Sequence, residues 1–181
     1  MEGATGVVFG IGYLVYGIGG MGGIRGIGET LFFLVISALL MAIFVFDWQY
    51  QIIPDQITFS AIILTLIYFS FAYPIPYTLY HIPIALGAMG FFLFLHLITK
   101  GKGMGFGDVK FAFLMGLLLG WPGILVALYF AFLTGAGVGI ILIVLKKKKF
   151  GQHIPFGPFL VAGTFVGLFF WEKLLKMLKM F

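Results

Sequence analysis

Residues 31–48 read LFFLVISALLMAIFVFDW, a long run of apolar and small residues that ends in an aspartate and a tryptophan. A run of this length is typical of a helix that crosses a membrane, which takes roughly 20 apolar residues. Of the 181 residues in the chain, 62% are hydrophobic and 9% are charged. A soluble domain carries about a quarter charged residues, so these charges cannot cover a soluble surface. We predict an integral membrane protein.

Seven apolar segments can be drawn, separated by short turns that contain Gly, Pro or charged residues. They predict an all-α fold: a polytopic bundle of about six to seven transmembrane helices, forming one membrane domain over residues 1–181. The N-terminal segment lacks the pattern of a removable signal peptide. The seven segments are Gly3–Ile24, Leu31–Phe46, Ile57–Tyr73, Tyr80–Ile98, Val109–Leu119, Ile124–Leu145 and Pro155–Trp171.

Basic residues predict the orientation, because Lys and Arg gather in cytoplasmic loops. If the first segment starts in the cytoplasm, the inner loops hold Lys100, Lys102, Lys110 and the cluster Lys146 to Lys149. The outer face then holds Arg25, Lys173, Lys176 and Lys179. The net charge of +5 therefore reports topology, and we expect no nucleic acid as a partner. The Lys146–Lys149 cluster is expected to anchor in lipid headgroups.

Two aspartates, Asp47 and Asp108, each lie at the edge of an apolar segment, and the predicted orientation puts both at the cytoplasmic face. An acid at such a position is costly and indicates a functional site. Two close carboxyl groups cannot both ionise easily, so they share a proton. One can then take a proton from water while the other donates to a carbonyl oxygen. We predict an aspartyl dyad for peptide hydrolysis; for Asp47, a purely interfacial carboxylate is the alternative.

Two further segments accompany these acids. Pro54-Asp55 precedes the third apolar segment, and Asp55 is expected to cap that helix, with a supporting role near the site as the alternative. From Gly101 to Gly107 every second residue is glycine, directly before Asp108. Such a backbone can adopt φ > 0 and lie close to another chain segment, so we expect it to deliver Asp108 to the site. A phosphate-binding loop is disfavoured because no Gly-Lys-Ser/Thr follows.

The sequence does not contain the residue patterns that other catalytic mechanisms require. The chain has no cysteine, which excludes a thiolate nucleophile and a Cys-based zinc site. His81, His96 and His153 are scattered, without the His-Glu-x-x-His pattern of zinc proteases. No serine has a Gly-x-Ser-x-Gly setting. We expect no metal and no cofactor, and we expect His96 to fill a helix interface or to make a local hydrogen bond.

Three segments, taken together, carry a resemblance to a known family. They are Asp47 with Ile53-Pro54-Asp55, then Gly105-Phe106-Gly107-Asp108-Val109-Lys110, and then Ile154-Pro155-Phe156-Gly157-Pro158-Phe159. In this order and at these separations they resemble the type IV prepilin peptidases, polytopic membrane aspartyl proteases of the Gly-x-Gly-Asp class. The resemblance covers about Glu29 to Gly167.

The resemblance implies that Asp47 and Asp108 are the catalytic pair, at the cytoplasmic face of the inner membrane. It implies removal of a short basic leader from prepilin or pseudopilin precursors, in type IV pilus and type II secretion systems, usually between Gly and Phe. It further implies that the site is lined by Gly105, Phe106, Gly107, Lys110, Pro155, Phe156, Gly157 and Pro158, with Pro54 and Asp55 in support. The alternatives are a basic membrane anchor for Lys110 and a simple turn into the last span for residues 154–159.

Typical bacterial members of that family carry an additional cytoplasmic domain with two Cys pairs, which is linked to methylation by S-adenosylmethionine. The absence of cysteine here leads us to expect no N-methyltransferase activity. The alternatives to a peptidase are a proton- or ion-coupled transporter that uses buried acids and an inactive scaffold of the same fold. The sequence leaves the oligomeric state open.

Overall fold

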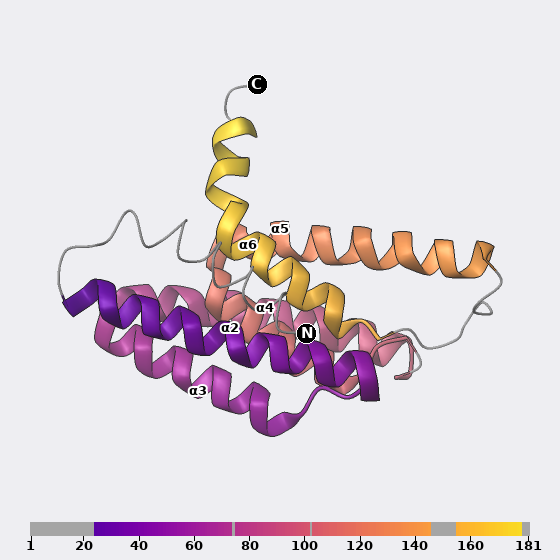
Figure 1. The fold of residues 1–181 in the computed structure, drawn as a ribbon, viewed down its shortest axis with the longest axis horizontal. Coiled ribbons are helices and arrows are strands. Elements are labelled where there is room, and N and C mark those ends of the chain that lie inside the picture. The colour runs from indigo at the N-terminus through magenta and orange to yellow at the C-terminus, as the bar shows by residue number, and fades with distance from the viewer. Residues whose placement is uncertain (1–23, 74, 102, 146–154, 179–181) are drawn as a thin grey trace.

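The fold is that of a computed structural model, which describes residues 24–73, 75–101, 103–145 and 155–178 (Figure 1). Within these ranges the chain forms helices joined by short connections, and no strand is present. The helices are α2 (Ile24–Tyr50), α3 (Asp55–Ala72), α4 (Ile75–Ile98), α5 (Phe106–Val144) and α6 (Gly157–Leu178).

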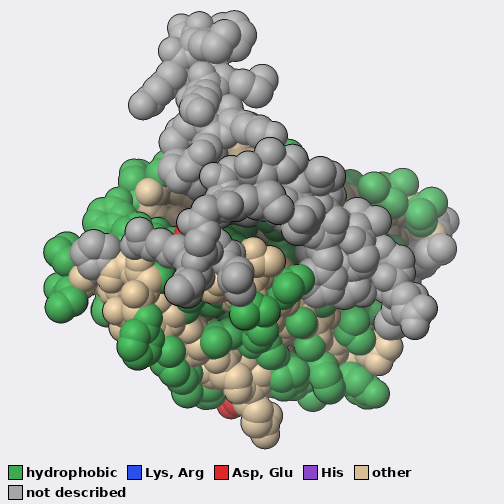
Figure 2. Space-filling model, turned by 60° about the vertical axis from the view of Figure 1, so that its left-hand side comes forward, with side chains coloured by type: hydrophobic (Ala, Val, Ile, Leu, Met, Phe, Trp, Pro, Cys, Tyr) green, Lys and Arg blue, Asp and Glu red, His purple; other side chains and the backbone are tan. Residues whose placement is uncertain are grey.

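Of the helices in the described ranges, four are long and apolar enough to cross a membrane, and Gly157–Phe170 of α6 is a shorter apolar helix. Among the side chains coloured by type on the face shown in Figure 2, hydrophobic ones predominate and charged ones are few. The predicted all-α membrane class is therefore confirmed. The expected span Gly3–Ile24 and the Lys146–Lys149 cluster lie outside the described residues, and the number of six to seven spans stays a prediction.

The core lies around α5, against which α4 and α6 pack most extensively, while α2 packs against α6 and α3. α2 and α3 run side by side (Figure 1), with the rings of Phe32 and Tyr68 stacked at 4.0 Å between centroids. On α2 the buried residues Ile36, Leu40 and Ile43 follow the spacing of one helical face. The fully buried side chains that these helices pack together include Ile36, Leu40, Ile43, Phe92, Val109, Phe111, Leu114, Met115 and Leu160.

A break at Gly120 divides α5 into two arms, which correspond to the expected spans Val109–Leu119 and Ile124–Leu145. Gly120 has φ 59° and ψ −166°, and Trp121 has φ −94° and ψ 136°, neither of which is helical. The second arm doubles back along the bundle (Figure 1). His81 Nδ1 donates to the carbonyl of Leu117, in the turn before the break, at 2.8 Å.

We expect Gly120→Ala to lower the free energy of unfolding by about 1–3 kcal/mol, because this backbone conformation is essentially restricted to glycine. In addition, a Cβ at this position would lie 2.8 Å from the His81 ring. Thermal unfolding in detergent measures the effect. Gly137→Ala on the same helix is the matched control, since a Cβ there meets nothing within 4 Å. Equal stability of the two variants would contradict this account of the break.

One end of the bundle gathers four helix termini from distant parts of the sequence. The end of α2 meets the start of α6, where Gly157 N donates to Asp47 Oδ2. The start of α3 meets the start of α5, where Lys110 pairs with Asp55. The fold thus brings the expected site residues to a single end of the molecule.

Candidate active site

Asp47 lies in the last turn of α2 and continues the buried face formed by Ile36, Leu40 and Ile43. Its side chain is only 5% exposed. The backbone N–H of Gly157, 110 residues further along the chain, donates to Asp47 Oδ2 at 2.8 Å. A buried carboxyl group needs such donors, because burial without a partner is costly. The start of α6 therefore holds the Asp47 carboxyl group in place.

Gly157 can make this contact only because it has no side chain. A Cβ at this position would lie 2.6 Å from Asp47 Oδ2 and 2.8 Å from its Cγ. These atoms belong to a short, buried side chain that has little room to move. Glycine is thus required here for close approach.

Asp108 lies in the first turn of α5 and is 7% exposed. Its Oδ2 accepts a hydrogen bond from the backbone N–H of Gly105 at 3.0 Å, while its own N–H donates to the Gly105 carbonyl at 3.2 Å. A side chain in the first turn that accepts from the N–H of the residue before the helix forms one half of a capping box. The helix start thus fixes the orientation of the Asp108 carboxyl group, as the start of α6 does for Asp47.

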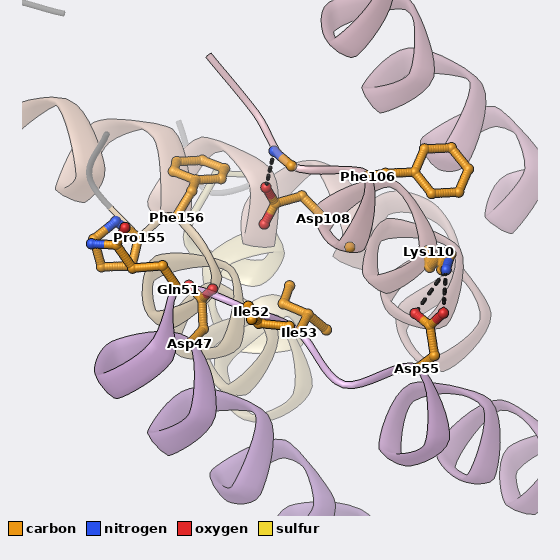
Figure 3. A pocket seen from close by; sticks show the side chains of 12 residues that line it. Asp47, Gln51, Ile52, Ile53, Asp55, Phe106, Asp108, Lys110, Pro155 and Phe156 are labelled. Atoms are coloured by element: carbon orange, nitrogen blue, oxygen red, sulfur yellow. Dashed lines mark hydrogen bonds and ion pairs between the residues drawn. The ribbon is translucent and has the colours of Figure 1, made fainter. Parts of the chain in front are cut away.

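Both carboxyl groups line one pocket of about 300 Å³ at this end of the bundle (Figure 3). The pocket lies between the end of α2, the connection to α3, the start of α5 and the segment before α6. Its lining residues are Asp47, Gln51, Ile52, Ile53, Asp55, Gly105, Phe106, Gly107, Asp108, Lys110, Pro155 and Phe156.

Most of the site residues expected from the sequence meet at this pocket, with three exceptions. Gly157 contributes through its bond to Asp47, whereas Pro158 is buried at the start of α6 and lies outside the lining. Pro54 also lies outside the lining, and its carbonyl accepts hydrogen bonds from Thr58 N and Oγ1, each at 3.1 Å. Ile154 falls outside the described residues.

Three lining residues were missing from the expected set: Gln51, Ile52 and Ile53. Gln51 follows Asp47 by four residues, so helical spacing could have placed it on the same face. It has φ 55° and its N–H donates to the Asp47 carbonyl at 2.9 Å, which ends α2. Ile53 belongs to the segment Ile53-Pro54-Asp55 that carries the family resemblance, but nothing in the sequence indicated that the side chain of Ile52 or Ile53 would face a pocket.

The expected capping role of Asp55 is wrong. The residue that precedes α3 is Pro54, and α3 has no side-chain cap hydrogen bond. Asp55 is the first residue of the helix, and both of its carboxylate oxygens lie 2.7 Å from Lys110 Nζ. The Lys110 side chain is 21% exposed and that of Asp55 is 56% exposed. The Asp55 carboxylate therefore pairs with Lys110 on α5 and makes no capping hydrogen bond to its own helix.

Two glycines of the segment 101–107 meet different structural requirements. Among the described residues only Gly101 of this loop has positive φ, at 72°. Gly107 instead allows close packing, since a Cβ there would lie 2.9 Å from the Cβ of Ile53. His96 stabilises the loop by donating from Nδ1 to the Met104 carbonyl at 2.8 Å, which matches the local hydrogen bond expected for it.

Comparison with known proteins decides the family. The sequence profile of the type IV leader peptidase family matches residues 34–140, more than half of the chain. This chain belongs to the type IV leader peptidase family. The matched range includes both aspartates, whereas Pro155 and Phe156 lie outside it and join the pocket through the fold.

Several curated relatives of this family are similar to the chain, and each is named as a prepilin leader peptidase/N-methyltransferase. The Pseudomonas putida protein is 28% identical over 149 residues, covering 81% of this chain and 52% of that protein. The Aeromonas hydrophila protein is 30% identical over 155 residues, with the same coverage. A Burkholderia pseudomallei protein is 30% identical over 151 residues, covering 79% and 47%. The chain spans about half the length of these relatives, and no solved structure matches it significantly.

Proposed function

We propose that this member of the type IV leader peptidase family is a membrane aspartyl endopeptidase that removes the leader from prepilin-like precursors. The observation that carries the proposal is that Asp47 and Asp108, from separate helices, are both buried and line the same pocket. The names of the relatives support the substrate class. Asp47 and Asp108 are proposed as the catalytic residues, and the pocket that they line as the place where the scissile peptide binds.

The chemistry follows from two carboxyl groups that share one proton. The ionised carboxylate takes a proton from a water molecule as the water oxygen attacks the carbonyl carbon of the scissile peptide. The protonated carboxyl gives its proton to the carbonyl oxygen, which yields a tetrahedral intermediate. When the C–N bond breaks, the proton taken from water passes to the leaving amine, and the carbonyl re-forms with return of the other proton. The products are a leader with a new carboxylate and a mature chain with a free amine.

The backbone contacts suit this role because each carboxyl group accepts a hydrogen bond from a backbone N–H. Gly157 N–H binds Oδ2 of Asp47, and Gly105 N–H binds Oδ2 of Asp108. A hydrogen bond to one oxygen fixes the orientation of the whole carboxyl group. Such fixed geometry provides a large share of the rate enhancement in enzymes.

We place the pocket at the cytoplasmic face of the inner membrane, where the precursor's leader would reach it. The excess of Lys that the sequence puts in the loops predicted to be cytoplasmic supports the orientation. The hydrophobic part of the precursor would remain in the bilayer beside α2, whose last turns expose Trp48 and Tyr50. Such aromatic side chains are typical of the membrane–water interface.

The test is leader removal by the purified chain in lipid vesicles, with a pilin precursor as substrate. We expect two products whose masses place the cut after a glycine, at the junction between the leader and the hydrophobic segment. Intact precursor after long incubation with a well-folded chain, for several precursors, would reject the proposed function.

A further inference from the structure

The ion pair between Asp55 and Lys110 lies at the side of the pocket away from Asp47, with Ile53 between them (Figure 3). Lys110 Nζ lies 2.7 Å from each of the two Asp55 oxygens. It also lies 5.1 Å from the ring centre of Phe106 and 5.7 Å from that of Phe59. Contacts of a cation with two ring faces add to the attraction of the carboxylate, so the Lys110 ammonium has one well-defined position.

This ion pair joins the two parts of the chain that carry the aspartates. Lys110 follows Asp108 by two residues, near the start of α5. Asp55 begins α3, directly after the connection 51–54, whose other end is fixed to Asp47 by the Gln51–Asp47 backbone hydrogen bond. Beside the ion pair, Ile53 packs against Gly107 in the same two segments. Through the connection 51–54, the ion pair therefore links the segment that carries Asp47 to the segment that carries Asp108.

We propose that the Asp55–Lys110 ion pair sets the separation of Asp47 and Asp108, so that both members are positioning residues for the catalytic pair. The inference rests on the proposed function in assigning catalysis to the two aspartates. A partly exposed ion pair contributes little to global stability. Its effect is instead local, because small displacements of reacting groups lower catalytic rates strongly.

The first test compares neutral variants with a conservative one. Asp55→Asn and Lys110→Met remove one charge each, and Lys110→Met keeps the apolar stem that packs on the two rings. We expect each to lower kcat for leader removal by about 10-fold, with KM unchanged within about twofold because uniform substrate binding is not affected. The double variant should lose no more than either single one, since both remove the same interaction. Lys110→Arg retains the cation and should restore most of kcat.

Glu29→Gln is the matched control for loss of a carboxylate. Glu29 lies in the first turns of α2, about 27 Å along the helix from Asp47, and should leave kcat unchanged. An unchanged kcat in Asp55→Asn and Lys110→Met, an effect confined to KM, or a double variant with the multiplied loss of the two singles would each overturn the positioning role.

A second readout does not depend on activity. Amide hydrogen exchange followed by mass spectrometry should be faster in segments 51–57 and 104–110 of both neutral variants, unchanged in segment 85–92, and normal in Lys110→Arg. Unchanged exchange in the first two segments would overturn the proposal even if leader removal occurs normally. Faster exchange together with no leader removal by the unaltered chain would retain the ion pair's role in geometry and reject the proposed function.

Discussion

Asp47→Asn and Asp108→Asn are each expected to slow leader removal by at least about 1000-fold, because the amide that replaces the carboxyl group can neither accept nor donate the proton that the reaction requires. The remaining acid cannot perform both proton transfers alone. Rates of product formation, measured by mass in lipid vesicles at saturating precursor, give the size of each loss.

Both variants should fold, so the loss can be assigned to chemistry. An Asn side chain has nearly the shape of Asp, and its amide oxygen can accept the same hydrogen bond from Gly157 or Gly105. Helix content and detergent-extracted yield should therefore match those of the unaltered chain. Glu29→Gln, at the far end of α2, is the control for a lost acid. Retention of more than a tenth of the activity in either Asp→Asn variant would remove that residue from the catalytic pair.

Gly157→Ala is expected to lower kcat by about 100-fold, although the substitution adds a single methyl group. The added Cβ would lie 2.6 Å from Asp47 Oδ2, so either the carboxyl group or the start of α6 must move. The N–H of residue 157 then no longer holds the Asp47 carboxyl group in its present orientation. A displacement of about 1 Å in a catalytic group is sufficient for a loss of this size. Single-turnover kinetics with the precursor measure the effect.

The matched control is Gly87→Ala on α4, where a Cβ meets nothing within 4 Å. Alanine favours helix over glycine, so this variant should be as active and at least as stable as the unaltered chain. If Gly157→Ala were as active as Gly87→Ala, the start of α6 would have no part in orienting Asp47.

The membrane class and the candidate acids could be predicted from the sequence because both depend on rare residues. With 9% charged residues the chain has few acids, so an acid next to an apolar run is conspicuous. The alternation of segments across the membrane then predicted that Asp47 and Asp108 would reach the same face. The structure places both aspartates in one pocket. The predicted topology alone gave no distance or contact between them.

The remaining parts of the site depend on contacts between distant segments, which local patterns do not reveal. Asp55 directly follows a proline before a helix, a typical capping position, yet it pairs with a lysine 55 residues away. The family resemblance implied that residues 155–158 line the site, but no pattern in the sequence indicated that the N–H of Gly157 would bind Asp47. A turn between two spans was expected after Leu119, whereas the structure has a tight break at Gly120, next to which His81 donates to the Leu117 carbonyl.

The central claim, that Asp47 and Asp108 act as one catalytic unit, is tested most directly by comparing the double variant Asp47→Asn/Asp108→Asn with the two single variants. Single-turnover rates of leader removal are measured for all three under the same conditions. Residues that act as a unit show strongly non-additive losses, so we predict that the double variant is no slower than the slower single variant. A double variant whose loss equals the product of the two single losses would contradict the claim and show that the aspartates act independently.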